Sequence, residues 1–377
     1  MHKKEQMANK FPAVATLLGT IIGAGILGIP YVIMQSGFLI GLIHLVLIAG
    51  IILIIYLYLG EISLRTTKDH QLPGYAQKYL GKRGKTLMFL ALLFGVYSAL
   101  LAYLIGEGES LSFILFQTTD YSLYLGLAFW FALSILSYLG IKALKESEEI
   151  GMMLIFILII SITVLFWNKI SIYNLNYNDL SKFYAPFGVI LFAFLGFSTI
   201  PELKIILKKD KKEMRSSIII SVISALIIYI IFTLIVLGTK GVSTPEIATL
   251  ALGKPFILLG MLTMFTAYLA LSDALIDTFS LDYKISKVNS WLLTILPTIF
   301  LFVLINILKS ASFIKILGLG GVISGGISSI LILLIAKKAK RSCDRIPEYS
   351  IPYSKILTFI IIILLAIGTI FEILYLF

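Results

Sequence analysis

The stretch Thr16-Leu-Leu-Gly19-Thr-Ile-Ile-Gly23-Ala-Gly25-Ile-Leu-Gly28-Ile-Pro30-Tyr31 lies inside the first long apolar run of the chain. Four glycines crowd its centre, and a proline follows them. Glycine is a poor helix former because its unfolded backbone is so free, and proline removes a donor and clashes with the preceding turn. Backbone groups stay unpaired at membrane depth only where protein, water or a ligand satisfies them. The stretch therefore predicts a helix that is broken near the bilayer centre, with amides and carbonyls aimed at a polar group.

A second stretch, Phe192-Ala-Phe-Leu-Gly196-Phe-Ser198-Thr-Ile-Pro201-Glu202, interrupts a later apolar segment in the same way. Taken alone, the small residues of either stretch could equally serve tight helix packing. Both stretches, however, contain the pattern Gly-x-x-x-Ile-Pro, at Gly25 to Pro30 and at Gly196 to Pro201. Gly/Pro-interrupted spans at corresponding positions of two halves point to a transporter site at a repeat interface.

Composition predicts a membrane protein. The 377 residues are 59% hydrophobic and 14% charged, with a mean hydropathy of +1.01, whereas a soluble domain would expose far more charge. The net charge of +11 lies in short loops between apolar runs, which argues against nucleic acid as a partner. One cysteine, Cys343, excludes an intramolecular disulfide, and three scattered histidines make no metal site. We therefore predict one transmembrane domain over 1–377, with no metal and no cofactor beyond a coupling ion.

The apolar runs define the predicted spans, since a membrane-crossing helix needs about 20 apolar residues. Eleven segments qualify: 12–35, 38–60, 86–116, 121–140, 148–167, 183–207, 216–238, 252–280, 290–308, 313–336 and 353–376. The predicted fold class is an all-α polytopic membrane protein with eleven transmembrane helices, of which helices 1 and 6 are broken.

The lysines and arginines predict the orientation. Most of the 31 fall in cytoplasmic loops if the N-terminus is cytoplasmic, as the positive-inside rule requires. The C-terminus then lies outside, and the basic run 204–215 is a cytoplasmic loop that helps to set this topology. The first and sixth spans run in opposite directions, which an inverted five-plus-five repeat requires. Repeat one covers about 12–167, repeat two about 183–336, and 353–376 is an accessory helix.

The two breaks suit a small zwitterion. A half-helix N-terminus offers free N–H groups and positive partial charge, which bind a carboxylate without an arginine. The C-terminal ends of the other half-helices, near 20–22 and 192–195, offer carbonyls to an ammonium group or a small cation. Neither break contains a lysine or arginine, which fits an α-amino acid better than a dianion.

These residues carry a resemblance to a known family. The run 19–31, followed by 34–38 and Gly41, resembles the first helix of the amino acid/auxin permease family, and 192–202 resembles its sixth. The segment 266–282 is similar to the eighth helix of the related aromatic and hydroxy amino acid permeases. The resemblance implies the leucine transporter fold of the amino acid permease superfamily, with substrate between helices 1, 3, 6 and 8.

Carried over to this sequence, the resemblance implies a set of substrate-binding residues. They are Ile22, Gly23, Ala24, Gly25, Tyr103, Phe192, Ala193, Phe194, Leu195, Gly196, Phe197 and Ser198. The main chains of the two breaks would meet the substrate main chain. The aromatic rings would favour a neutral, mostly apolar side chain, although any single ring could equally be a packing or lipid-facing residue.

The coupling ion is predicted from fewer residues. By the resemblance, sodium would be held at Gly19, Ile22, Thr263 and Thr266, through first-helix carbonyls and eighth-helix hydroxyls. The residue after Thr266 is alanine where many sodium sites have serine, which weakens that interpretation. Some proton-coupled relatives use a lysine in the fifth helix, but 151–167 contains none. A proton carrier would then have to be a carboxylate.

Acids inside spans are costly and are functional candidates by default. Glu202, just after the second break, is a candidate for the coupling proton or for a gate. Glu107 and Glu109, toward the outer end of the third span, are gate candidates. So are Asp273 and Asp277, one helical turn apart on the eighth span.

The sequence thus predicts a secondary active transporter in the cell membrane that imports neutral amino acids, aromatic or other apolar ones among them. Alternating access around the two breaks would be driven by H⁺, with Na⁺ coupling as the alternative. A membrane amino acid sensor of the same fold is a further alternative. An enzyme is disfavoured, because no metal-ligand pattern, serine elbow or aspartate pair on two separate helices is present. The expected partners are the amino acid and the lipid bilayer.

Overall fold

The computed structural model describes residues 2–139, 147–208 and 210–376. Every regular element in these ranges is helical, and their one β-bridge is an isolated pair between Gly37 and Asn178. The α-helices are α1 (His2–Ile21), α2 (Gly25–Ser36), α3 (Phe38–Arg65), α4 (Leu72–Phe116), α5 (Ser122–Leu139), α6 (Ser147–Phe166), α7 (Phe187–Ala193), α8 (Thr199–Ile206), α9 (Met214–Lys240), α10 (Lys254–Asp277), α11 (Lys287–Leu308), α12 (Phe313–Gly320), α13 (Gly326–Ala339) and α14 (Lys355–Leu376).

Short turns of tighter or wider helix join or extend these elements. The 3₁₀ turns are η2 (Trp167–Lys169), η3 (Ile172–Leu175), η4 (Leu180–Lys182), η5 (Lys211–Glu213), η6 (Gly241–Ser243) and η7 (Ala248–Ala251), and the π-helical turns are η8 (Thr278–Asp282) and η9 (Gly321–Gly325).

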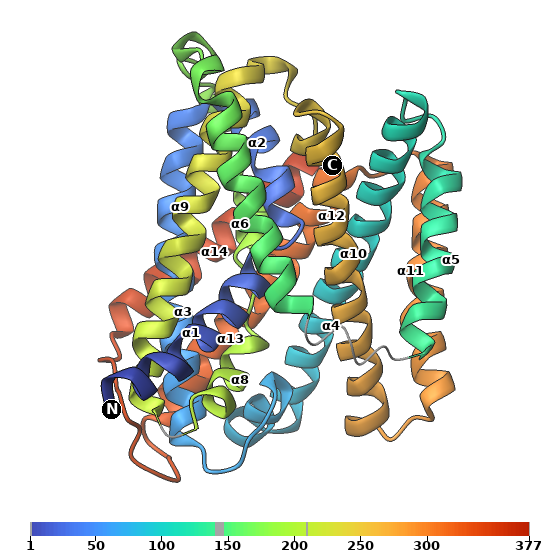
Figure 1. Ribbon diagram of the computed structural model, residues 1–377. Coiled ribbons are helices and arrows are strands. Elements are labelled where there is room, and N and C mark those ends of the chain that lie inside the picture. The colour runs from blue at the N-terminus through green and yellow to red at the C-terminus, as the bar shows by residue number, and fades with distance from the viewer. Residues whose placement is uncertain (1, 140–146, 209, 377) are drawn as a thin grey trace.

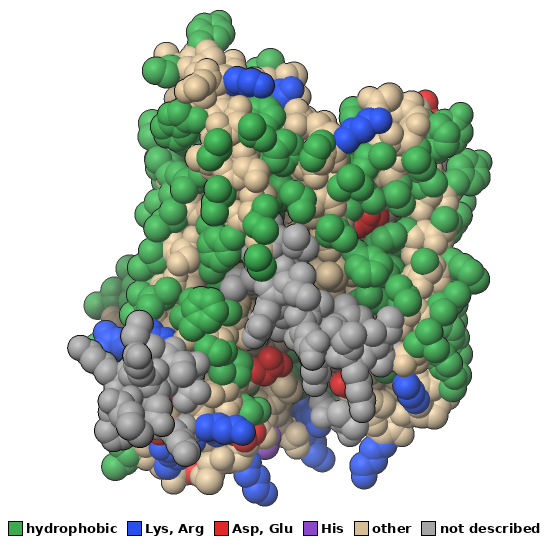
Figure 2. All heavy atoms as spheres, viewed as in Figure 1, with side chains coloured by type: hydrophobic (Ala, Val, Ile, Leu, Met, Phe, Trp, Pro, Cys, Tyr) green, Lys and Arg blue, Asp and Glu red, His purple; other side chains and the backbone are tan. Residues whose placement is uncertain are grey.

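Eight helices in the described ranges are long and apolar enough to cross a membrane, or nine if the bent pair α1–α2 is one span. They are α3, α4, α5, α9, α10, α11, the continuous α12–η9–α13 and α14. Hydrophobic side chains cover the middle of the surface in Figure 2, and lysines and arginines lie toward its two ends. These features indicate a multi-pass membrane protein, as the composition predicts.

The helices form one bundle around the two interrupted spans (Figure 1). The pair α5 and α11 packs beside α4 at one edge, and α3 and α9 pack together at the opposite edge. Helix α1 runs from the lower left toward the centre, and the short helices α2 and α8 lie between these edges. Helix α14 packs on α7, α12 and α13.

Both predicted interruptions are present. The first helix ends at Ile21 and resumes at Gly25 with a bend of 53°. In the second interrupted span, the first half-helix (α7) ends at Ala193 and the second half-helix (α8) begins at Thr199. Pro30 lies inside α2 without ending it, so the glycines at 23 and 25, rather than the proline, mark the break.

Helix α4 begins earlier than the predicted span 86–116. It starts at Leu72 and includes one non-helical residue, Gly81, whose φ of 80° lies in the left-handed region. Only glycine adopts that conformation at little cost, so the chain turns there from a short helical arm into the long span.

The basic run 204–215 begins with a charge that is not solvated. Lys204 is 5% exposed, and its Nζ donates to the carbonyl oxygens of Thr66 at 2.8 Å and Thr67 at 3.3 Å. It also pairs with Asp69 at 2.7 Å. Because a buried ammonium needs such partners, Lys204 fastens the end of α8 to the loop after α3.

Candidate functional site

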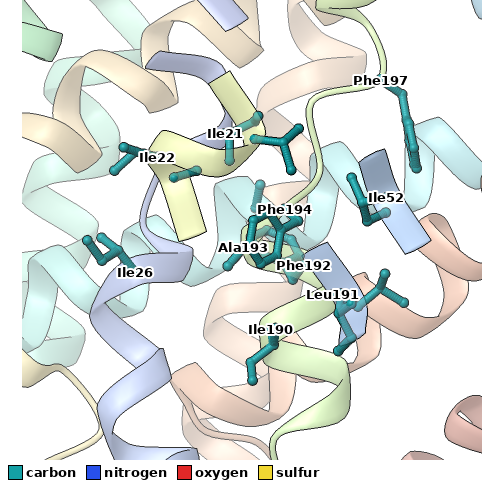
Figure 3. Close-up of a cluster of buried hydrophobic side chains, with 14 of the residues drawn as sticks. Ile21, Ile22, Ile26, Ile52, Ile190, Leu191, Phe192, Ala193, Phe194 and Phe197 are labelled. Atoms are coloured by element: carbon teal, nitrogen blue, oxygen red, sulfur yellow. The ribbon is translucent and has the colours of Figure 1, made fainter. Parts of the chain in front are cut away.

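The two interrupted spans touch at their breaks. The hydroxyl of Tyr229 in α9 donates to the carbonyl oxygens of Ile21 at 2.9 Å and Ala193 at 2.7 Å. A Cβ placed on Gly25 would lie 2.6 Å from the Cα of Ala193, so only glycine permits this approach. Figure 3 shows Ile21 and Ile22 of one break beside Ala193 and Phe194 of the other. The glycine pattern therefore brings two stretches some 170 residues apart in sequence to about one point.

Each break leaves amides that no other backbone group takes. In the first, the N–H groups of Ala24 and Gly25 donate to no backbone carbonyl of the described chain, although that of Ala24 donates to the hydroxyl of Tyr103. In the second, Gly196, Phe197 and Ser198, which precede α8, also donate to no backbone carbonyl of that chain, although the Gly196 amide donates to the hydroxyl of Tyr56. These amides stand at the N-terminal ends of α2 and α8, where the helix dipole adds positive potential. Both ends are suited to bind a carboxylate.

The break after α1 also leaves carbonyls open. The oxygens of Gly19, Thr20 and Ile22 accept no hydrogen bond from the described residues, whereas Leu18 accepts from the amide of Ile22 at 2.9 Å. The open carbonyls stand at the C-terminal end of α1, where the helix dipole favours positive charge. They are suited to an ammonium group or a small cation.

The second break offers fewer open carbonyls than the sequence predicts. Phe192 accepts from the Leu195 amide at 2.9 Å, and Ala193 accepts from Tyr229. Phe194 accepts from the hydroxyl of Tyr56 in α3 at 2.5 Å. Of the four carbonyls at 192–195, only that of Leu195 has no partner in the described chain. The hydroxyls of Tyr56 in α3 and Tyr229 in α9 therefore bond two of the carbonyls that were predicted to bind substrate.

A cavity of about 290 Å³ opens beside the two breaks. Its walls come from α1, the two breaks, α4, α6, α8, α10 and η9. It follows α1 back to Thr16 and α8 onward to Glu202, but reaches only Gly25 of α2. The cavity therefore extends from the breaks toward the end of the bundle where α1 begins.

The structure places ten of the twelve predicted substrate-binding residues in the cavity wall. They are Ile22, Gly23, Gly25, Tyr103, Phe192, Ala193, Leu195, Gly196, Phe197 and Ser198. Ala24 and Phe194 are fully buried and lie outside this wall. The Phe194 ring packs instead on Tyr229, with the ring centres 5.1 Å apart.

The ion-coupling candidates also line the cavity: Gly19, Ile22, Thr263, Thr266 and Glu202. The hydroxyl of Thr263 donates to the Gly260 carbonyl at 2.7 Å, and that of Thr266 donates to the carbonyls of Leu262 and Thr263, both at 3.1 Å. Donation leaves their lone pairs open to a cation. Glu202 is an exposed residue at the cavity wall.

The four gate candidates lie outside the cavity wall. Glu107 is fully buried in α4, and neither carboxyl oxygen has a hydrogen-bond partner in the described chain. Glu109 is partly buried on the same helix. Asp273 is partly buried and Asp277 exposed, near the end of α10. None of the four gate candidates therefore meets the others at the cavity.

Several cavity residues were not predicted from the sequence. Leu92, Gly95, Val96 and Ala99 line it from α4, and Ser324 lines it from η9. The sequence does contain a signal for Ser324, which lies in the glycine-rich run Gly318-Leu-Gly-Gly-Val-Ile-Ser-Gly-Gly326. A dense run of glycines in a span indicates that another backbone approaches closely. The α4 residues are ordinary apolar positions that carry no such signal.

Comparison with known proteins identifies the family. A model of the tryptophan/tyrosine permease family matches residues 7–254. The chain belongs to the tryptophan/tyrosine permease family. It is also 24% identical to the tyrosine-specific transport system 1 of Haemophilus influenzae, over 94% of each chain. This permease is therefore an amino acid transporter of the membrane and not an enzyme, as the breaks predict.

The fold has a counterpart among solved structures. The crystal structure of MhsT in complex with L-phenylalanine superimposes with a TM-score of 0.68, at 13% identity, over 97% of the permease and 98% of that chain. This likeness supports the leucine transporter fold. The resemblance to amino acid permeases is thus confirmed, whereas the family that matches is the tryptophan/tyrosine permease family and not the amino acid/auxin permease family.

Proposed function

We propose that this permease is a secondary active transporter that imports aromatic amino acids by alternating access. The observation that carries the proposal is the cavity at the two breaks, where open amides and open carbonyls face one space. Such a space complements the two charges of an amino acid main chain without any charged side chain.

The amide of Gly25, which lines the cavity, would hold the substrate carboxylate at the start of α2. The carbonyls of Gly19, Thr20 and Ile22 would hold its ammonium group at the end of α1. The glycines at 23 and 25 would let the substrate approach the backbone closely.

Aromatic substrates are favoured by the remaining walls of the cavity. These are apolar or small: Leu92, Gly95, Val96, Ala99, Ala267, Ala270 and Leu271. A volume of about 290 Å³ is close to the lower limit for small-ligand sites, which are mostly apolar with a few placed polar groups. The names of the family and of the Haemophilus relative, and the phenylalanine bound to MhsT, support the same substrate class.

Coupling is assigned to H⁺, with Glu202 as its carrier. Glu202 is the acidic residue of the described cavity wall, and it is exposed there. The alternative is Na⁺ at Gly19, Ile22, Thr263 and Thr266, which also line the cavity. The alanine after Thr266 removes one hydroxyl from that set and favours H⁺.

The proposed topology has eleven spans in an inverted five-plus-five repeat, with a cytoplasmic N-terminus and an external C-terminus. In this topology α1–α2 is span 1, α7–α8 is span 6, and α14 is the accessory helix. Spans 1, 2, 6 and 7 would rock against spans 3, 4, 8 and 9. The cavity runs along α1 and α8, so the structure would represent an inward-facing state.

The test is uptake by proteoliposomes across a panel of the common amino acids, first with an imposed pH gradient and then with a sodium gradient. Accumulation of tyrosine, tryptophan or phenylalanine under the pH gradient alone is the expected result. Counterflow of the same amino acids, without any gradient, separates a transporter from a sensor. Absence of counterflow for every aromatic amino acid would refute the proposal.

A further inference from the structure

Ser324 is a polar residue in an apolar part of the cavity wall. It lies in the π-helical turn η9, is 3% exposed, and lines the cavity. Its hydroxyl makes no hydrogen bond with any described residue. Serine and threonine hydroxyls inside helices commonly bond a carbonyl one turn back, as Thr298 does to Thr294 at 3.0 Å. The Ser324 hydroxyl therefore retains unused hydrogen-bonding capacity at the cavity.

The backbone of η9 packs closely against α7 and the second break. A Cβ on Gly321 would overlap the carbonyl oxygen of Gly188 and lie 2.8 Å from the amide nitrogen of Phe192. A Cβ on Gly325 would lie 2.9 Å from Leu195. Packed cores of this density do not deform continuously, so Ser324 is fixed beside the break. Wide helical turns of this kind occur frequently at functional sites.

Helix α4 leaves a space for Ser324 on the other side. A Cβ on Gly95 would overlap the Ser324 hydroxyl and lie 2.8 Å from its Cβ. Gly95, Leu92 and Val96 line the cavity together with Ser324. The hydroxyl thus stands at an apolar wall built by α4 and η9.

The other hydroxyls of the cavity have given their protons to helix carbonyls or lie at the breaks. Thr263 and Thr266 donate to carbonyls of α10, and Thr20 and Thr199 share a hydrogen bond of 2.9 Å. The hydroxyl of Tyr103 in α4 lies at the first break, 3.2 Å from a Cβ placed on Gly23. An amino acid whose main chain lies at the breaks would direct its side chain to the walls of α4, α10 and η9. On those walls, the hydroxyl of Ser324 is the placed polar group that can fix orientation and specificity.

We infer that Ser324 is a specificity-determining residue, which bonds the hydrogen-bonding group of an aromatic side chain: the hydroxyl of tyrosine or the ring N–H of tryptophan. The inference rests on the proposed function. A serine hydroxyl both donates and accepts, so it serves either group. A ring without such a group would bury the Ser324 hydroxyl unpaired, and sites of this kind reject analogues that lack the partner.

The test compares tyrosine with 4-methylphenylalanine, which has nearly the shape of tyrosine but no hydroxyl. Half-saturation for counterflow is measured in proteoliposomes of wild type, Ser324→Ala and Ser328→Ala. Wild type is expected to favour tyrosine by about tenfold, the size of one hydrogen bond. Ser324→Ala is expected to remove that preference by weakening tyrosine alone. Ser328, one turn further on, is fully buried, lacks a partner and lies outside the cavity wall, so Ser328→Ala is the matched control and keeps the preference.

The outcomes separate the inference from the proposed function. If wild type transports both compounds without preference, or if Ser324→Ala keeps the preference, the inference is overturned while aromatic transport stands. If wild type transports neither, the proposed function fails and the inference with it. Should Ser324→Ala not fold, Gly95→Ala gives the second variant, because its methyl group displaces the Ser324 hydroxyl and is expected to remove the same preference. An unchanged preference in a folded Gly95→Ala would overturn the inference.

Discussion

The hydroxyl of Tyr229 lies 2.7 Å from the carbonyl oxygen of Ala193 and donates to it, from a helix that belongs to neither break. The same hydroxyl reaches Ile21 at 2.9 Å, so one phenol joins the ends of α1 and α7. The Ala193 carbonyl has no other partner in the described chain, whereas the Ile21 carbonyl also accepts from the Gly23 amide at 2.9 Å. The two breaks are therefore held together by a side chain as well as by their glycines.

Tyr229→Phe tests this bridge. The change removes one hydroxyl from a fully buried ring and leaves the Ala193 carbonyl unpaired, which we expect to cost about 1–3 kcal/mol of stability. Thermal unfolding in detergent should show a lower midpoint, and half-saturation for substrate should rise. Tyr58→Phe is the control, since Tyr58 also bonds a carbonyl, that of Pro352 at 3.1 Å, away from the cavity. Equal transport in both variants would contradict a role for the bridge in the site.

Gly25→Ala tests the contact between the breaks. The added Cβ would lie 2.6 Å from backbone of Ala193, which cannot rotate away, so one break must move. We expect most substrate uptake to be lost. Gly50→Ala is the matched control: Gly50 lies inside α3 with nothing within 4 Å of its added Cβ. That change should keep uptake and raise stability by up to about 1 kcal/mol.

The breaks could be predicted from sequence because their causes are local. Glycine and proline act on their own backbone, and a repeated Gly-x-x-x-Ile-Pro pattern is visible without any contact map. The same locality explains why most helix limits are close to those of the predicted apolar segments, although α4 begins at Leu72 and not at 86. The substrate class followed from the same residues, since open peptide groups without a charged side chain suit a zwitterion.

Long-range contacts explain what the sequence did not reveal. Phe194 was predicted for the side-chain pocket, but its neighbours Tyr229 and Tyr56 come from other helices. The hydrogen-bond partners of a backbone carbonyl cannot be inferred from its own segment. Ser324 was missed for the same reason, because only the packing of η9 on α4 and the second break places its hydroxyl at the cavity.

The carboxyl of Glu372 allows a test of how α14 is held against α7 and α12. Its carboxyl is 2% exposed, accepts from the Gly188 amide at 3.2 Å, and lies against Gly318. Glu372→Leu leaves the amide at the start of α7 unpaired, so thermal unfolding should show a loss of about 1–3 kcal/mol. Glu372→Gln keeps an oxygen that can accept, and should stay near wild type. Equal losses in both variants would indicate that shape, and not this hydrogen bond, secures α14.

The contacts of Asp344 with Lys78 and Thr67 should depend on pH, and they lie in a loop outside the membrane-spanning helices. Hydrogen bonds from Lys78 and from the Thr67 amide hold the pKa of this exposed carboxyl at about 2. Because that pKa is depressed, the contact stabilises the fold above the unfolded pKa of about 4 and is lost as the pH falls toward 2. The unfolding midpoint of wild type should exceed that of Asp344→Asn at pH 7, and the difference should shrink between about pH 4 and pH 2. A difference that is constant across this range would argue against the carboxylate as its source.

Glu202→Gln separates coupling from binding. Glu202 lines the cavity past the second break, so a proton bound there could leave with the substrate through the same opening. The amide cannot titrate, and we therefore expect accumulation under a pH gradient to disappear while counterflow of tyrosine continues. Asp273→Asn is the control, because Asp273 lies outside the cavity wall and should keep both activities. Gradient-driven accumulation that survives in Glu202→Gln would move the coupling proton to another residue, and accumulation that then responds to sodium alone would favour the site at Gly19, Ile22, Thr263 and Thr266.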